Sequence, residues 1–278
     1  MTDIGIISLV LIAVNFLFSY QGFKDPSFFD ASKFEVDSIL IGKDYKRLVT
    51  SGFLHVGWTH LIFNMISLYA FSTLIEEDLG RVNFLIIYFA SLIGGDLLAL
   101  FVHRNHGDYS AVGASGAVSG VIFASIVLYP DIEIGMVVLP VFIKGWIYGI
   151  LYVLYSIYGI KSNKDNIGHE AHLGGALIGI LAVLILRPTA WQDNYLTILL
   201  ITVPMVVFIW LIITRPQVLL IDNFYFKTHN DHYDLEHDFN AGRTDKQKDL
   251  DFLLDKINKK GMRSLSKKER ERLDEYSK

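Results

Sequence analysis

Residues 82–102, VNFLIIYFASLIGGDLLALFV, carry one charged side chain, Asp96, in an apolar run long enough to cross a lipid bilayer. Six further segments are apolar over a similar or slightly shorter length, and they are residues 4–20, 58–75, 115–129, 136–158, 171–186 and 195–214. The short runs at 115–129 and 171–186 are acceptable where helix ends lie inside protein around a wet cavity. Soluble cores do not contain so many long apolar runs in succession. The sequence therefore predicts an all-α polytopic membrane bundle with about seven transmembrane helices.

Composition divides the chain into a lipid-like part and a water-like part. Of the 278 residues, 52% are hydrophobic and 19% charged, and Lys and Arg number 11 up to Thr214 and 14 after it. We predict a six-helix membrane core over residues 1–190, an additional transmembrane helix over 191–214, a polar linker over 215–243 and a soluble helical hairpin over 244–278. The N-terminal run is expected to be a retained span, because it lacks a basic leader and a small-residue cleavage site.

Two function classes are excluded or disfavoured by the same composition. The formal net charge is −4 and no basic patch is interleaved with aromatic residues, which argues against a nucleic-acid partner. The chain has no cysteine, which excludes thiol catalysis and Cys-ligated zinc. Nothing in the composition indicates an oligomeric state.

Polar residues inside the predicted spans are the candidates for function, because such residues are costly in lipid. Three clusters stand at the starts of the second, fourth and sixth spans, and they are His60–Asn64, Gly113–Gly116 and Ala171–Gly175. Two membrane crossings separate each cluster from the next. All three clusters are therefore expected on the same side of the bilayer and at similar depth.

Paired glycines predict that two of these spans pack closely. Small residues four positions apart let membrane helices approach each other, and each of the fourth and sixth spans has such a pair. The pairs are Gly116 with Gly120 and Gly175 with Gly179. If these faces meet, Ser115 and His172 come within reach of each other.

The chemistry of these side chains indicates acyl transfer. A serine hydroxyl is a weak nucleophile until a base removes its proton, and His172 is the natural base for Ser115. Attack on a carbonyl creates an oxyanion that needs donors in place. His60 and Asn64 lie one helical turn apart on one face, and the backbone N–H of Ser115 is a further donor at a helix N-terminus.

The three motifs together resemble those of the rhomboid family of intramembrane serine proteases, over about residues 1–190. That family has HxxxN on the second span, GxSG at the start of the fourth and AHxxGxxxG on the sixth, which correspond here to His60–Asn64, Gly113–Gly116 and Ala171–Gly179. His55 is similar to the family's extra histidine near the mouth of the site. Glu76 with Gly80 resembles the family's acidic residue and glycine after the second span.

The resemblance implies an endopeptidase with a Ser115–His172 dyad that works through an acyl-enzyme. His60 and Asn64 would form the oxyanion hole, with His55, Gly113, Gly116, Gly175 and Gly179 in support. Substrates would be transmembrane proteins in the lipid bilayer, and no metal or cofactor is implied. Some members carry an aromatic residue four positions after the nucleophile, stacked on the catalytic histidine, whereas this chain has Ser119 there. Support for the imidazole is therefore expected from elsewhere in the chain.

Other readings of the sequence are weaker but remain open. His169-Glu-Ala-His172 is similar to a zinc HExxH motif, but the position of the second histidine is Leu173. Asp96 lacks the second aspartate that an aspartyl protease needs. A rhomboid-like protein that binds membrane proteins without cutting them is the main alternative, and a transporter is disfavoured by the lack of an internal repeat. Metal binding by three tail histidines is a further alternative to a solvated linker (His229, His232 and His237).

Two further features are left as alternatives. Residues 21–57 form either an amphipathic element in the membrane plane or a folded loop. More Lys and Arg lie on the side of the three clusters than on the other side, so the positive-inside rule favours a cytoplasmic site, whereas the resemblance implies a site facing the opposite compartment. A bacterial cell membrane is the expected location.

Overall fold

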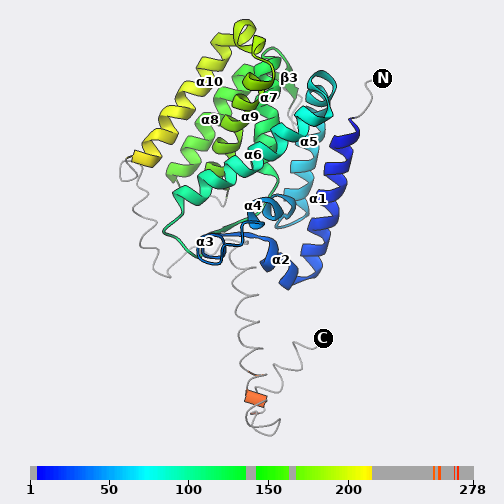
Figure 1. The fold of residues 1–278 in the computed structure, drawn as a ribbon, viewed down its shortest axis with the longest axis vertical. Coiled ribbons are helices and arrows are strands. Elements are labelled where there is room, and N and C mark those ends of the chain that lie inside the picture. The colour runs from blue at the N-terminus through cyan, green and yellow to red at the C-terminus, as the bar shows by residue number, and fades with distance from the viewer. Residues whose placement is uncertain are drawn as a thin grey trace. The chain divides into compact units, whose positions relative to one another are not determined.

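The computed structural model describes residues 5–135, 142–162 and 167–214, together with five residues of the tail, Leu253, Lys256, Ile257, Ser266 and Lys268. Ten α-helices lie in residues 5–214 of this described part (Figure 1). They are α1 (Ile6–Lys24), α2 (Pro26–Ser32), α3 (Val36–Leu40), α4 (Arg47–Thr50), α5 (Trp58–Leu79), α6 (Arg81–Val102), α7 (Ser115–Leu128), α8 (Gly145–Ser162), α9 (His169–Leu186) and α10 (Thr189–Thr214). A 3-10 turn η1 (Ser51–Phe53) and two short strand pairs, β1 (Phe34–Glu35) with β2 (Ser110–Ala111) and β3 (Glu133–Gly135) with β4 (Phe142–Lys144), complete these residues.

Each of the seven predicted spans corresponds to one helix of the bundle. Among the described residues, α1, α5, α6, α9 and α10 are long and apolar enough to cross a membrane by themselves, and α7 and α8 are shorter apolar helices. The prediction of a helical membrane bundle is therefore confirmed. α7 is short because it lies inside the bundle, where every side chain from Gly116 to Val127 is buried.

The start of α8 differs from the prediction. The sequence predicts a span over residues 136–158, but residues 142–144 form strand β4, and α8 begins only at Gly145. Strand β4 pairs antiparallel with β3, and the Gly145 N–H donates to the Ile132 carbonyl at 2.8 Å. An apolar run of this composition is compatible with a helix or a strand, so hydropathy does not locate the start of α8.

Glycine contacts fix α9 against α7. A Cβ added at Gly175 would lie 2.8 Å from the carbonyl carbon of Gly116, and one added at Gly179 would lie 2.6 Å from the Gly120 Cα. Real Cβ atoms do not approach backbone atoms so closely. The two predicted glycine pairs therefore face each other, and the backbones of α7 and α9 are in direct contact.

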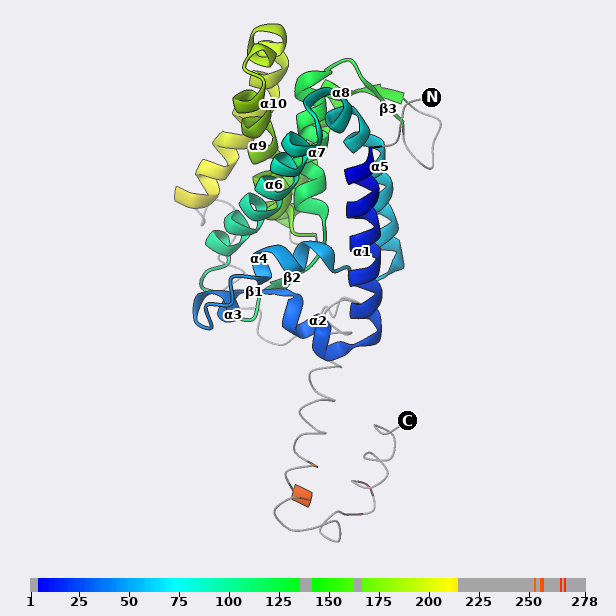
Figure 2. The same ribbon diagram turned by 45° about the vertical axis from the view of Figure 1, so that its right-hand side comes forward.

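The opposite side of α9 packs on α6 in a similar way, which the sequence does not predict. A Cβ added at Gly174 would lie 3.0 Å from the Gly95 Cα, and one added at Gly95 would lie 2.5 Å from the carbonyl oxygen of Ala171. α9 thus packs against both α6 and α7 through backbone contacts, and the three helices lie close together in Figure 2.

A buried carboxylate attaches α1 to α5. Glu76 accepts hydrogen bonds from the Ile7 N–H at 3.0 Å, the Ser8 N–H at 3.0 Å and the Ser8 hydroxyl at 2.9 Å. The two N–H groups are free donors of the first turn of α1, where the helix dipole favours a negative charge. Gly80, with φ of 84°, then ends α5 and begins α6. The residues matched by family resemblance, Glu76 and Gly80, therefore anchor α1 and make the turn between spans.

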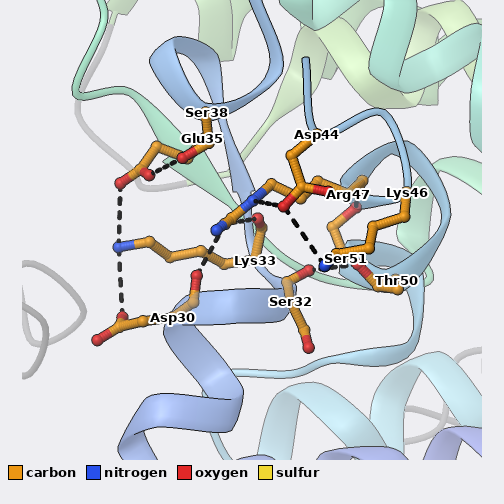
Figure 3. A network of polar contacts seen from close by, with 10 residues as sticks. All are labelled: Asp30, Ser32, Lys33, Glu35, Ser38, Asp44, Lys46, Arg47, Thr50 and Ser51. Atoms are coloured by element: carbon orange, nitrogen blue, oxygen red, sulfur yellow. Dashed lines mark hydrogen bonds and ion pairs between the residues drawn. The ribbon is translucent and has the colours of Figure 1, made fainter. Parts of the chain in front are cut away.

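The connection from α1 to α5 is a folded element held by Arg47 (Figure 3). This guanidinium is 9% exposed, and it donates to the carbonyls of Asp30 and Lys33 at 2.7 Å each and to the Asp44 carboxylate at 3.1 Å. The two carbonyls lie at the C-terminal end of α2, where a positive charge is favoured. Arg47 therefore ties α2 to α4.

The opposite end of the bundle is closed by two polar contacts. Arg187, after α9, donates to both carboxylate oxygens of Asp78 on α5, at 2.5 and 2.8 Å. Asn194 donates to the last carbonyls of α7, those of Val127 at 2.9 Å and Leu128 at 3.3 Å. α10 is thereby attached to the C-terminal end of α7.

The chain divides into two compact units, residues 1–227 and 228–278. The predicted linker over 215–243, the three tail histidines and most of the predicted hairpin over 244–278 lie outside the described residues. Of the second unit, Leu253 is helical and buried.

Candidate active site

Ser115 and His172 meet at the starts of α7 and α9. The Ser115 Oγ lies 2.7 Å from the His172 Nε2, although 57 positions separate the two residues in the chain. Both side chains are half-buried. The distance is that of a good hydrogen bond between a hydroxyl and a ring nitrogen. When the hydroxyl donates this bond, Nε2 carries the lone pair that a general base needs.

His60 faces the same small space beside Gly113. A Cβ added at Gly113 would lie 3.0 Å from the His60 Nε2 and 3.5 Å from the Ser115 Oγ. Gly113 also has φ of 135°, a backbone conformation that side chains other than glycine rarely adopt. Both the backbone and the surrounding space therefore require glycine here, and a ring nitrogen and the serine hydroxyl border the space that it leaves.

Asn64 lies one turn along α5 from His60 and is 7% exposed. Its Nδ2 donates one hydrogen bond to the His60 carbonyl at 3.1 Å. A primary amide has a second N–H, which is the donor that an oxyanion would use. The structure thus places His60 and Asn64 on one helix, with the His60 ring beside the serine.

His55 positions the loop that leads to the serine. Its Nε2 accepts from the Ala114 N–H at 3.5 Å, and its Nδ1 lies 2.9 Å from the Ser19 Oγ, whose hydroxyl donates to the Phe53 carbonyl at 2.8 Å. Ser19 has one proton, so His55 donates from Nδ1 and accepts at Nε2, as a neutral imidazole does. Burial, together with the neighbouring His60, lowers the pKa of His55 to about 3, which keeps this ring neutral.

Asp96 supports the same loop from α6. Its Oδ2 lies 3.0 Å from the Ser51 hydroxyl, and the Ser51 carbonyl accepts the Gly113 N–H at 3.0 Å. An intramembrane aspartate is a functional suspect by default. Here Asp96 contacts Ser51 of η1, and Ser51 in its turn binds the backbone of Gly113. Asp96 therefore helps to position the loop that carries Ser115.

The aromatic neighbour of His172 is not predicted by the sequence. The Tyr152 ring of α8 lies 6.2 Å from the His172 ring, centroid to centroid, at an interplanar angle of 34°. The Tyr152 hydroxyl is 2.6 Å from the Ser119 Oγ, which donates to the Ser115 carbonyl at 2.7 Å. Ser119 has the small polar side chain that such a contact needs, but the sequence gives no signal for the partner on α8.

The histidine and glutamate of the zinc-like motif have other partners. His169 is 1% exposed, with its ring 5.2 Å from the Tyr155 ring. The Glu170 Oε1 lies 3.7 Å from the Nε2 of His103, the residue that follows α6. Within the described ranges, the side chains of His, Asp and Glu do not form a group of three that could hold a metal ion. Glu170 therefore links α9 to α6.

Comparison with known proteins gives two family matches. Residues 42–189 match the model of the rhomboid domain, and these residues contain every motif described above. Residues 233–278 match a family of unknown function (DUF6576).

Several curated relatives carry rhomboid names. Rhomboid protein 1, mitochondrial, of Saccharomyces cerevisiae is 32% identical over 150 residues, which cover 51% of this chain and 43% of the relative. Rhomboid-like protein 11, chloroplastic, of Arabidopsis thaliana is 32% identical over 163 residues, covering 53% and 55%. The putative rhomboid protease YdcA of Bacillus subtilis is 33% identical over 143 residues, covering 50% and 68%.

These matches show how much of its relatives the chain covers and bear on the membrane in which it lies. The chain spans about half the length of the first curated relatives that it matches. The chain is an integral membrane protein, as its apolar helices and the rhomboid domain indicate. The expected bacterial cell membrane is not supported, because mitochondrial and chloroplast proteins are among the relatives.

Proposed function

Because the chain belongs to the rhomboid family, we propose that it is an intramembrane serine endopeptidase in which Ser115 is the nucleophile and His172 the general base. The observation that carries this proposal is the 2.7 Å contact between the Ser115 Oγ and the His172 Nε2. The two residues start two helices of a membrane bundle, and backbone contacts between glycines hold those helices together. A structural role alone does not require a base beside a hydroxyl.

The reaction follows from the positions of these atoms. The His172 Nε2 takes the hydroxyl proton as the Ser115 Oγ attacks the peptide carbonyl carbon, and a tetrahedral oxyanion forms. The C–N bond then breaks, and the amine leaves with the proton from His172. Water then attacks the ester on Ser115 and gives a proton to His172. The bond between the acyl carbon and the Ser115 Oγ breaks, and His172 returns the proton to that oxygen, which regenerates the serine as the acid product leaves.

The oxyanion needs donors that are already in place. The Ser115 backbone N–H lies in the first turn of α7, where helix donors are free and the dipole favours negative charge. The His60 ring borders the space beside Gly113, and Asn64 follows on the same face of α5. We assign these three groups to the oxyanion.

The substrates proposed are transmembrane proteins. A site at the starts of membrane helices meets a peptide bond only where a substrate helix unwinds, because a helical backbone is fully hydrogen-bonded to itself. Segments with small residues and weak helix propensity are therefore the expected targets.

A reconstituted cleavage assay tests the proposal. Purified wild-type chain in liposomes is expected to cut a panel of model transmembrane substrates and to react with a fluorophosphonate probe, whereas Ser115→Ala and His172→Ala lose both activities. Ser125→Ala is the matched control, since Ser125 lies on the same helix. Its hydroxyl contacts the carbonyls of Val121 at 3.0 Å and of Phe71 on α5 at 3.3 Å rather than a member of the dyad.

The outcome separates an enzyme from a binding protein of the same family. Cleavage that depends on Ser115 but not on Ser125 supports the enzyme. Wild-type chain that binds the transmembrane substrates without cutting any of them, and that takes up no probe at Ser115, would overturn it.

A further inference from the structure

Tyr152 of α8 contacts both helices that carry the proposed dyad. Its ring faces the His172 ring of α9 at 6.2 Å between centroids, and its hydroxyl lies 2.6 Å from the Ser119 Oγ of α7. Ser119 is one helical turn after Ser115 and bonds to the Ser115 carbonyl. Through one side chain, the base on α9 and the nucleophile helix α7 are therefore connected to α8.

The direction of the hydrogen bonds shows what holds the phenol. The Ser119 hydroxyl has one proton, which it donates to the Ser115 carbonyl at 2.7 Å. The Ser119 oxygen must therefore accept the bond that joins it to Tyr152, and the Tyr152 hydroxyl donates it. A larger residue than serine at position 119 would occupy the place of the phenol hydroxyl.

Aromatic neighbours hold the ring from the other sides. The Phe123 ring of α7 meets the Tyr152 ring edge-on at 5.4 Å, and the Tyr148 ring of α8 lies at 5.9 Å, both within the range of favourable aromatic pairs. One turn before Tyr152, the Ile201 side chain of α10 fills the notch at Gly149, where an added Cβ would lie 2.8 Å from the Ile201 Cδ1. The ring is thus packed in a fixed place rather than free to turn away from His172.

We propose that Tyr152 is the positioning residue for the His172 imidazole and that Ser119 is its anchor. This inference rests on the proposed function and adds to it a residue on a third helix. Without the phenol ring, the imidazole loses the surface that limits its rotation, and the Nε2 lone pair is aimed at the Ser115 hydroxyl for a smaller fraction of the time. The consequence is a lower turnover rate with little change in substrate binding.

The test is a set of four variants in liposomes. Tyr152→Leu removes the ring, and we expect kcat to fall about 50-fold with KM changed less than about 3-fold, in line with the cost of a misplaced catalytic group. Tyr152→Phe removes only the anchoring hydrogen bond, whereas Ser119→Ala removes that bond together with the one to the Ser115 carbonyl. Each variant is expected to lower kcat about 5-fold. The kcat of the double variant Tyr152→Phe/Ser119→Ala should be no lower than that of Ser119→Ala alone, because Ser119→Ala already deletes the bond that Tyr152→Phe removes.

Tyr158→Leu is the matched control on the same helix. Tyr158 is 62% exposed, so its loss removes a ring of the same kind away from the dyad, and cleavage is expected to stay at the wild-type rate. The rate of fluorophosphonate labelling gives a second readout, because it depends on the dyad and not on docking of a protein substrate. Labelling should slow in parallel with kcat for the Tyr152 variants.

Three outcomes would overturn the inference. One is unchanged kcat and labelling in Tyr152→Leu, and another is a raised KM with unchanged kcat, which would make Tyr152 a substrate contact. Additive losses in the double variant would separate Tyr152 from Ser119 and refute the anchor. In each case wild-type cleavage still supports the proposed function, whereas wild-type chain that neither cuts nor labels at Ser115 overturns both.

Discussion

Replacing Gly175 by alanine is expected to separate α9 from α7 and to break the contact between Ser115 and His172. The added Cβ would lie 2.8 Å from the Gly116 carbonyl carbon and nearer still to its oxygen, against an ordinary contact of at least 3.4 Å. Backbone atoms cannot turn aside as a side chain does. The helices must therefore move apart by about 1 Å at this level, one turn from the dyad.

The effect on the rate follows from that displacement. The distance between the Ser115 Oγ and the His172 Nε2 would rise from 2.7 Å to roughly 3.5 Å, beyond a good hydrogen bond. A misplacement of about 1 Å can cost about 100-fold in rate, which corresponds to about 2.7 kcal/mol of transition-state stabilisation. Stability is expected to fall by about 1–3 kcal/mol, as for other overpacked positions.

Gly116→Ala is the matched control, because it introduces the same methyl group between the same two helices. The Cβ added there would lie 3.4 Å from the Ala171 carbonyl oxygen, which is an ordinary contact. We therefore expect Gly116→Ala to keep activity within about 3-fold of wild type, although Gly116 belongs to the GxSG motif.

The assay compares both variants with wild type in liposomes, by cleavage of a model transmembrane substrate and by fluorophosphonate labelling. Thermal unfolding in detergent micelles reports stability in parallel. Equal activity of Gly175→Ala and Gly116→Ala would refute the reasoning, because an added Cβ meets backbone at 2.8 Å or less at Gly175 and only at 3.4 Å at Gly116.

Three further changes probe the scaffold. Glu76→Gln should lower the free energy of unfolding by about 1–2 kcal/mol, because the cap of α1 loses its charge; an unchanged midpoint of thermal unfolding would contradict this. Burial and the neighbouring His60 lower the pKa of His55 to about 3. Between about pH 6.5 and 3 the unfolded chain therefore binds more protons than the folded chain, and stability falls as the pH falls, by up to about 1.4 kcal/mol per pH unit. His55→Gln should flatten this pH dependence of unfolding, and an unaltered slope would argue against it. Arg187→Lys should cost about 1 kcal/mol of stability by losing the two-pronged contact with Asp78, and Asp78→Asn should then add little further, which a double-mutant cycle measures.

Hydropathy and the number of membrane crossings predict most of the bundle and the approach of Ser115 to His172. Apolar length decides whether a segment spans, so helices such as α6 and α10 follow from their own sequences. The side of the membrane follows from the number of crossings, which brings Ser115 and His172 to one end. The glycine pairs supply the remaining condition, which is a close approach of α7 and α9.

Other features depend on which faces of the helices meet, and this pairing of faces cannot be read from a single sequence. Tyr152 reads as one of many aromatic residues on α8, and only the fold shows that it faces His172 and Ser119. The sequence also does not indicate what Gly95 contacts, and only the fold shows that the backbone of α9 packs against it. The start of α8 was predicted wrongly because pairing between two strands, not hydropathy, sets it.

Glycines on two sides make the helix that carries His172 sensitive to length. Gly174 meets α6 and Gly175 meets α7, so the rotation of α9 about its own axis is set by backbone contacts. Successive residues of an α-helix point about 100° apart. One residue inserted between His172 and Gly174 would leave both glycine contacts intact and turn the imidazole about 100° away from the serine. Lipid-facing positions such as Ile185, 77% exposed, have no such constraint. The number of residues between the imidazole and the glycines is therefore as much a part of the site as the residues themselves.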